Sequence, residues 1–376
     1  MPMRARVLVL WAVSFLAAAG CERVPRRPLP QTAPPPKSVC PLEVTSRESD
    51  GRLIVTAGTL VMGGVPARVH LSGETRESAP PGLHALAVDE IRRVEGELSS
   101  YDARSEIRRL SDASAGTWVA LGANSVAVLS LARAIHDRTG GAFDVTVGPL
   151  VRAYGFHRDE PPSWPPEEEL AAARARVGMD RIELDPAGSR ARTLVAGMWI
   201  DTSAIAKGYA VDRAAEVLRS KGVAHALVEI GGEMVAVGPR APGRPWTIVV
   251  ESPRALESTR GFATEIALPT PGGLSAVATS ADTYQHFEHG GRRYSHIIDP
   301  RTGLPRTGGV VSATVLARDC ATADGLATAL CVLPADEGVA LVEGWSDIEA
   351  LLLVEDARGA LGERRTSGFP AVPQGM

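Results

Sequence analysis

The sequence predicts an α+β protein in which antiparallel sheets are covered by helices. Short β-rich runs outnumber the helical segments, and turns such as Gly231-Gly232 are too short to hold a crossover helix. Helical and strand segments also mix without the regular alternation that a parallel sheet requires. With 376 residues, 44% of them hydrophobic, the chain is long enough to bury a large core.

Four segments are expected to be helices, because apolar residues recur in them at helical spacing or typical end signals flank them. Asn124 is the expected N-cap of the second helix, and the acidic run 167–169 favours the first turn of the third. The four segments are residues 81–98, 124–139, the stretch after Pro165-Pro166, and 205–221.

Runs rich in β-branched and aromatic residues are expected to be strands. Ala196-Gly197 and Gly231-Gly232 are expected to join two pairs of them as hairpins. The runs are residues 67–71, 182–184, 193–195, 198–200, 227–230, 234–237, 247–250, 262–268, 293–298 and 312–316.

The charges nearly cancel, with 40 basic against 44 acidic residues and a net charge of -4. Nucleic-acid binding usually leaves a basic patch and a high pI, so this balance gives it no support. A phosphate-bearing small molecule needs only a few local donors and stays compatible with the composition.

The N-terminus is expected to direct export. Residues 1–20 have a basic start and an apolar run too short to span a bilayer, which is typical of a signal peptide. Cys21 ends a segment that resembles a bacterial lipobox and would carry a lipid anchor to the membrane, on the extracytoplasmic (periplasmic) side. Residues 21–43 are a Pro-rich tether and 44–370 the folded domain. An ordinary signal peptide followed by a disordered tail remains the alternative.

The cysteines do not form a metal-binding pattern, since the sequence holds no CxxC motif and no Cys/His cluster. Cys320 and Cys331 lie 11 residues apart. In an oxidising compartment they could form a disulfide or stay as buried thiols, and the sequence leaves both open.

Two segments could bind a flat, phosphorylated ligand. In residues 139–150, Phe143 and Asp144 place an aromatic ring beside an acceptor, although a helix C-cap explains the glycines alone. In residues 201–209, a turn leads from a strand into a helix, where backbone N–H groups and Lys207 could meet a phosphate. A simple N-cap is the alternative there.

Two further segments could carry catalytic groups. His296 lies in residues 294–305, before a tight turn, and is either a base or a structural histidine. Asp324 and Thr328 are four residues apart, so on a helix they share one face. Carboxylate and hydroxyl oxygens suit Mg²⁺ or Ca²⁺. The alternative is a capping Asp and a Thr bonded to its own helix.

Taken in order, these blocks resemble the FAD:protein FMN transferase family, the ApbE family, over about residues 62–333. The departures from its usual pattern are Gly64, Ser203-Ala204, Glu233 and Ala281. Ala327 stands where some members carry a second carboxylate and is itself a familiar choice in the family. The blocks that carry the resemblance are Met62-Gly63-Gly64, Ser99–Asp102 with Ser105–Ile107, and residues 140–150, 206–212, 230–233, 278–280 and 294–305.

The resemblance implies an ApbE-like, T-fold-related architecture and an enzyme. Such an enzyme cleaves FAD, releases AMP and attaches FMN through a phosphoester bond to a Thr or Ser of a target protein. The implied partner is an acceptor flavoprotein subunit of a membrane redox complex. An Mg²⁺-dependent FAD pyrophosphatase and a non-catalytic flavin-binding lipoprotein remain alternatives.

The resemblance also implies roles for single residues. The metal, Mg²⁺ or alternatively Ca²⁺ or another divalent ion, would be held by the backbone carbonyl of Ala204 and the side chains of Asp324 and Thr328. His296 is the candidate base, with Asp324 as the alternative. The residues expected to contact FAD are Met62, Tyr101, Ala142, Phe143, Asp144, Asp201, Lys207 and Ile298.

Overall fold

The computed structural model describes residues 42–370, except 50, 76–79, 157–160, 254–261, 271–272, 283–284 and 357. The expected signal peptide, Cys21 and nearly all of the expected tether therefore lie outside the described residues. Within the described part of the chain, no helix has both the length and the apolar character needed to cross a membrane.

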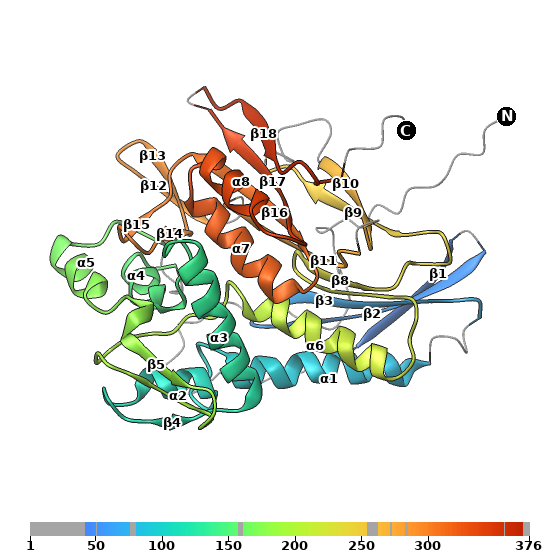
Figure 1. The fold of residues 1–376 in the computed structure, drawn as a ribbon, viewed down its shortest axis with the longest axis horizontal. Coiled ribbons are helices and arrows are strands. Elements are labelled where there is room, and N and C mark those ends of the chain that lie inside the picture. Colours follow the sequence, from blue (N-terminus) through green and yellow to red (C-terminus); the bar gives the residue numbers. More distant parts are fainter. Residues whose placement is uncertain are drawn as a thin grey trace.

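A large antiparallel sheet forms the centre of the molecule (Figure 1). Its nine strands follow the order β1-β2-β3-β7-β8-β11-β16-β17-β18, and every pair of neighbouring strands is antiparallel. The strands are β1 Glu43–Ser49, β2 Arg52–Val61, β3 Val65–Gly73, β7 Ala226–Ile230, β8 Glu233–Val237, β11 Ala276–Ala281, β16 Gly309–Ala317, β17 Glu349–Glu355 and β18 Leu361–Arg365.

Smaller sheets surround the large one. They are the hairpins β9–β10, β12–β13 and β14–β15, and the three-stranded sheet β4-β6-β5. Their strands are β4 Val119–Ala120, β5 Ile182–Asp185, β6 Arg190–Thr193, β9 Trp246–Glu251, β10 Phe262–Leu268, β12 His286–His289, β13 Arg292–Ser295, β14 Ile298–Asp299 and β15 Leu304–Pro305.

Helices cover one face of the large sheet, and the β9–β10 hairpin covers the other (Figure 1). The α+β prediction is confirmed. The helices are α1 Pro81–Leu98, α2 Glu106–Asp112, α3 Ala123–Arg138, α4 Gly148–Ala153, α5 Glu167–Arg174, α6 Ala206–Ser220, α7 Cys320–Val332 and α8 Ala335–Glu343, with short 3-10 turns η2 Val145–Val147 and η3 Met179–Arg181.

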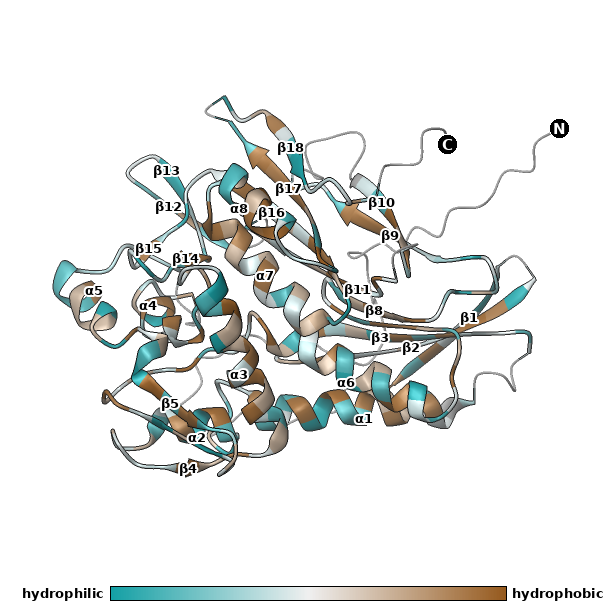
Figure 2. Cartoon of the chain, viewed as in Figure 1, coloured by the Kyte–Doolittle hydropathy of each residue, from teal (hydrophilic) through white to brown (hydrophobic). Residues whose placement is uncertain are grey.

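The two layers explain why the central strands are apolar on both faces, as the hydropathy colouring shows (Figure 2). Along β7, Ala226 and Val228 pack into the helix-side core, whereas Leu227 between them packs against the β9–β10 side. Because successive side chains of a strand point to opposite faces, a strand between two covering layers must be buried throughout. All five residues of β7 are buried.

Most of the expected elements are present, but the expected N-cap of α3 and the expected hairpin at Ala196-Gly197 were wrong. Helix α3 begins at Ala123 with Gly122 as its N-cap. The Asn124 side chain does not cap the helix but bonds to Glu97 and Tyr209, which ties α3 to α1 and α6. Residues 198–200 form no strand, because Ile200 donates its N–H to the Ser111 hydroxyl instead of to a strand partner. Ala196-Gly197 therefore joins no hairpin. The hairpin present in this region is β5–β6, which turns at residues 186–189.

The two cysteines of α7 are free thiols. Cys320 and Cys331 lie at opposite ends of this one helix. Eleven residues of helix span roughly 16 Å, whereas a disulfide requires Cα atoms within about 7 Å. Burial raises the pKa of the Cys331 thiol to about 12, and it also raises the pKa of Cys320, so both thiols stay protonated.

Candidate active site

Lys207 lies at the point where helix α6 begins and meets two carboxylates from distant parts of the chain. Its ammonium nitrogen is 2.5 Å from Oε1 of Glu233 and 3.5 Å from Oδ1 of Asp324. Glu233 follows the β7–β8 turn, and Asp324 comes from α7. The cluster therefore joins α6, the large sheet and α7 around one charged centre.

Burial sets the electrostatics of this cluster. The Asp324 carboxyl is 1% exposed and that of Glu233 is 4% exposed, whereas Lys207 is 25% exposed. Burial raises the pKa of Asp324, and the positive charge of Lys207 opposes the rise. Burial lowers the pKa of Lys207, but the charges of Asp324 and Glu233 outweigh it and raise this pKa overall. When both carboxylates are ionised, the two carboxylates and one ammonium give the centre a net negative charge that suits a further cation.

The loop before α6 holds Ala204 and is fixed by hydrogen bonds to the end of α1. Thr202 donates its hydroxyl to the Leu98 carbonyl at 2.7 Å, and its N–H to the Ser100 hydroxyl at 3.1 Å. Asp201 accepts the Ser203 N–H at 3.0 Å, which shapes the turn. These hydrogen bonds hold the junction that carries Ala204 and leads to Lys207. The strand expected before this junction is absent, and no side chain caps α6.

Helix α7 carries Asp324 and Thr328, as the four-residue spacing predicts. Asp324 Oδ2 accepts the backbone N–H of Gly208 at 3.0 Å. The Thr328 hydroxyl lies 3.0 Å from the Ser280 hydroxyl on β11. Thr328 therefore bonds to a neighbouring strand and not to the backbone of its own helix. A carboxylate, a hydroxyl and a backbone carbonyl, for which Ala204 is the expected residue, are hard oxygen donors, and this donor set fits Mg²⁺ or Ca²⁺.

The described residues contain no group of three or more His, Cys, Asp or Glu side chains that could hold a metal. The expected donor set, with one carboxylate, one hydroxyl and one backbone carbonyl, differs from such a group because Asp324 is its only charged member. Lys207 beside Asp324 compensates part of that buried charge. The residues present therefore fit a divalent ion that shares its shell with ligand oxygens and water.

His296 lies just after β13, near this centre. Its Nδ1 is 3.1 Å from the Gln285 carbonyl, which fixes the ring and leaves Nε2 as the other functional nitrogen. Burial lowers the pKa of His296, and the positive charge of Lys207 lowers it further. A neutral imidazole at neutral pH can accept a proton, so the structure is compatible with the role of base.

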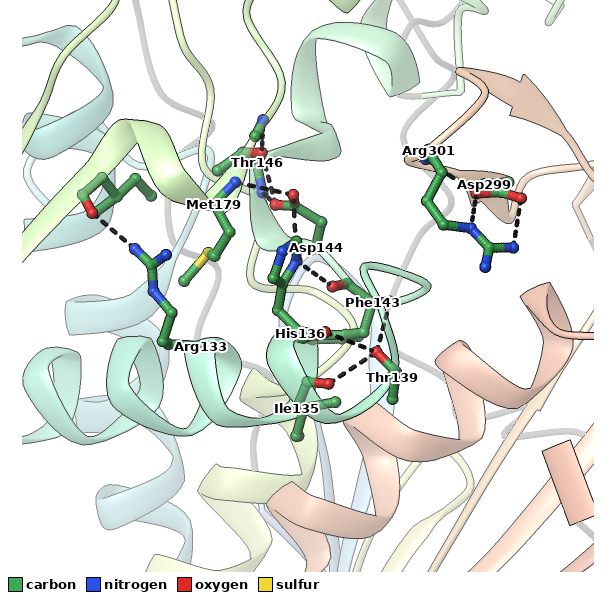
Figure 3. Close-up of polar contacts among 12 residues, drawn as sticks. Arg133, Ile135, His136, Thr139, Phe143, Asp144, Thr146, Met179, Asp299 and Arg301 are labelled. Carbon is green, nitrogen blue, oxygen red and sulfur yellow. Dashed lines mark hydrogen bonds and ion pairs between the residues drawn. The ribbon is translucent and has the colours of Figure 1, made fainter. Parts of the chain in front are cut away.

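The Asp144 side chain has hydrogen-bond partners inside the protein (Figure 3), and the Phe143 side chain is buried. Asp144 is 6% exposed and accepts hydrogen bonds from the Thr146 N–H and hydroxyl and from the Met179 N–H. Phe143 is 2% exposed and packs beside Gly325 of α7, next to Asp324. Asp144, which was expected to accept hydrogen bonds from a ligand, instead stabilises its own loop. Contact with FAD stays a prediction for both residues.

The other residues expected to contact FAD divide into buried and accessible ones. Ala142 and Ile298 are buried in two different core clusters. Tyr101 is 57% exposed, and its ring meets the Trp199 ring edge-on at 6.0 Å, beside the loop of Asp201. Met62 stands in the β2–β3 turn with φ +48. That turn lies next to the β7–β8 turn, which leads to Glu233. Of these four residues, only Tyr101 and Met62 have accessible side chains.

Sequence reasoning missed the partners that hold the site together. Glu233 was noted only as a departure from the pattern, and Ser280 only as part of a block. Asp212, which accepts hydrogen bonds from the start of α7, was given no role. Glu233, Ser280 and Asp212 each contact a residue of a separate element that is distant in the sequence. No short-range sequence pattern therefore predicts these contacts.

A shallow cavity of about 460 Å³ lies elsewhere, lined by Arg52, Ser72, Lys221 and His225 among others. Lys221 is the C-cap of α6, whereas Lys207 is near its N-terminus. The cavity therefore belongs to the other end of that helix and not to the site described above.

Comparison with known proteins gives a consistent answer. The ApbE family matches residues 63–352. The FAD:protein FMN transferase of Vibrio cholerae serotype O1 is 36% identical over 324 residues, which cover 82% of this chain and 94% of that relative. The FAD:protein FMN transferase of Haemophilus influenzae is 37% identical over 262 residues, covering 67% and 73%.

Solved structures agree with these matches. The flavin transferase ApbE from Vibrio cholerae superposes with a TM-score of 0.72 at 32% identity, covering 88% of this chain and 99% of that one. The ApbE protein of Thermotoga maritima superposes with a TM-score of 0.70 at 29% identity, covering 87% and 97%. The predicted ApbE-like architecture is confirmed.

Proposed function

We propose that this chain, which belongs to the ApbE family, is a metal-dependent FAD:protein FMN transferase. The observation that carries the proposal is the ion pair between the Lys207 ammonium and the Asp324 carboxylate, 3.5 Å apart, beside the loop of Ala204. A cation and a set of hard oxygen donors at one point suit a pyrophosphate, whose charge must be neutralised when it is split. The activity named for the relatives acts on such a bond in FAD.

A divalent metal bound by Ala204, Asp324 and Thr328 would supply charge neutralisation on the FAD pyrophosphate. In the proposed reaction, a Thr or Ser hydroxyl of the acceptor protein attacks the FMN-side phosphorus. A new P–O bond forms, the bond from this phosphorus to the bridging oxygen breaks, and AMP leaves. Lys207 stabilises the negative charge on the phosphate oxygens, and His296 takes the hydroxyl proton.

We further propose that the enzyme works outside the cytoplasm. The support is the sequence pattern of residues 1–43, with a signal peptide, a lipid anchor on Cys21 and a Pro-rich tether. Its acceptor is then an extracytoplasmic segment of a flavoprotein subunit in a membrane redox complex. Radiolabelled palmitate should be incorporated into the wild-type chain in cells and not into a Cys21→Ser variant.

The decisive experiment combines FAD, Mg²⁺ and a candidate acceptor protein, and mass spectrometry follows the acceptor. Transfer adds the mass of FMN to the acceptor, whereas hydrolysis yields free FMN and AMP with no mass gain. The Asp324→Ala variant should lose transfer by at least about 100-fold, since it removes the charged metal ligand. Wild-type transfer rates in Asp324→Ala would contradict the metal assignment, and free FMN alone would favour a pyrophosphatase.

A further inference from the structure

Helices α6 and α7 cap each other. The N-terminal turn of an α-helix leaves backbone N–H groups without partners inside the helix. At the start of α6, the Gly208 N–H is accepted by Asp324 of α7 at 3.0 Å. At the start of α7, the Cys320 N–H is accepted by Asp212 of α6 at 2.8 Å, and so is the Ala321 N–H, also at 2.8 Å.

The arrangement is reciprocal in sequence as well as in space. In α6, the capped residue Gly208 and the capping residue Asp212 are four positions apart, one helical turn. In α7, the same spacing separates Cys320 from Asp324. Each helix thus offers one turn with an N–H group at its start and a carboxylate at its end, and hydrogen bonds join the two turns in both directions.

Close backbone contact accompanies these hydrogen bonds. A Cβ atom on residue 208 would lie 2.6 Å from the carbonyl carbon of Cys320 and 2.9 Å from the nitrogen of Ala321. Only glycine allows this approach. The N-terminal turns of α6 and α7 therefore touch through their backbones, with no side chain between them.

This contact fixes the two halves of the proposed metal site. Ala204 lies in the loop that leads into α6, and Asp324 and Thr328 belong to α7. A small rotation of α7 would change the distance between the Ala204 carbonyl and the Asp324 carboxylate. Residues that orient metal ligands from outside the ligand set typically change metal affinity by about 10- to 100-fold when they are replaced.

We propose that Asp212 is a positioning residue for Asp324, which it holds in place by locking the start of α7 onto α6. Asp212 does not contact the reacting groups itself. The proposal rests on the proposed function for its activity measurement, but its exchange and binding measurements are independent of FMN transfer.

Two variants that each remove a carboxylate from the start of α7 test this role. Asp212→Asn weakens the lock between the helices. Asp319→Ala removes the N-cap that accepts the Thr322 N–H at the same end of α7, but it makes no bond to α6 in the described structure. Both variants lose a carboxylate from one helix end, so they separate the lock from ordinary helix stabilisation.

Calorimetric titration with Mg²⁺ alone measures how strongly each variant binds the metal. Asp212→Asn should bind Mg²⁺ at least about tenfold more weakly than the wild type, and Asp319→Ala within about twofold of it. Excess Mg²⁺ should restore FMN transfer in Asp212→Asn but not in Asp324→Ala. Equal affinity in wild type and Asp212→Asn, or an equal loss in both capping variants, would overturn the proposal.

Amide hydrogen exchange of the metal-free wild type provides a test that needs no variant to fold. The Gly208, Cys320 and Ala321 amides should exchange at rates within about tenfold of one another, because one opening of the lock exposes all three. Exchange of the Cys320 and Ala321 amides far faster than that of Gly208 would overturn the lock. If the wild type transfers no FMN, the proposed function fails, whereas this exchange result still stands.

Discussion

The ammonium of Lys207 lies 2.5 Å from Oε1 of Glu233, although α6 and the β7–β8 turn are separate elements. A lysine near the start of a helix is in an unfavourable position in the helix dipole. The buried carboxylate of Glu233 compensates for this and holds the ammonium beside Asp324. Glu233 is thus the residue that keeps Lys207 from pairing fully with the proposed metal ligand.

Replacing Glu233 should therefore affect metal binding as well as stability. In Glu233→Gln, Lys207 should move towards Asp324 and compete with Mg²⁺ for its oxygens. We expect a several-fold rise in the Mg²⁺ concentration needed for half-maximal FMN transfer, and a loss of about 2 kcal/mol in the free energy of unfolding. Glu233→Asp keeps the charge and should retain most of the affinity. Equal Mg²⁺ dependence in Glu233→Gln and wild type would contradict this reading.

The pH profile of FMN transfer tests His296. Because its pKa is lowered below the ordinary 6.5, first by burial and then by Lys207, the imidazole should stay neutral in mildly acidic solution. The wild-type rate should therefore fall only below pH 6.5. His296→Gln should be slower by about 100-fold or more and should lose this acidic limb.

A second histidine serves as the control for that profile. His225 precedes β7, whereas Glu233 follows it, so His225 lies at the other end of this strand. It is held by the Pro239 carbonyl at 2.6 Å. His225→Gln should keep the wild-type rate and the acidic limb. An acidic limb that survives in His296→Gln would assign it to another group.

The parts of the site that depend on local spacing could be predicted from the sequence. Asp324 and Thr328 share a helix face because they are four residues apart. Helix α6 begins and ends within one residue of its expected range, since a turn precedes it and Gly222 follows it. In both cases the signal lies within a few residues along the chain.

The partners of these residues could not be predicted, because tertiary packing sets them. Lys207 meets Glu233 across 26 residues, Thr328 meets Ser280 across 48, and Asp212 meets Cys320 across 108. No local periodicity encodes such pairs. The same reason explains why Asn124 was misread, since its amide bonds to another helix in preference to capping its own.

Unfolding as a function of pH tests the buried His84. Burial lowers its pKa below 6.5, and its Nε2 lies 3.1 Å from the Val55 carbonyl. Between the lowered pKa and 6.5 the unfolded chain binds a proton that the folded protein does not. The folded state is therefore stabilised above pH 6.5 and loses stability as the pH falls below it, by up to about 1.4 kcal/mol per pH unit.

The variant His84→Gln can still donate to Val55 but cannot take up a proton. Denaturant titrations at pH 7.5, 6.5 and 5.5 should show a smaller loss of unfolding free energy in the variant than in the wild type. A difference between the two proteins that stays constant over this range would mean that His84 does not cause the acid sensitivity.

Two glycines in helices should respond in opposite ways to replacement by alanine. A Cβ on Gly96 of α1 would have nothing within 4 Å, so Gly96→Ala should stabilise the protein by about 0.5–1 kcal/mol through helix propensity. Gly208→Ala would gain the same helix propensity, but its Cβ would clash with the backbone of Cys320, because it would lie 2.6 Å from the carbonyl carbon. Overpacking against a backbone cannot be relieved by a rotamer change, so Gly208→Ala should lose about 3 kcal/mol. Thermal unfolding of both variants measures these changes, and a Gly208→Ala protein as stable as Gly96→Ala would show that α6 and α7 can separate freely at this point.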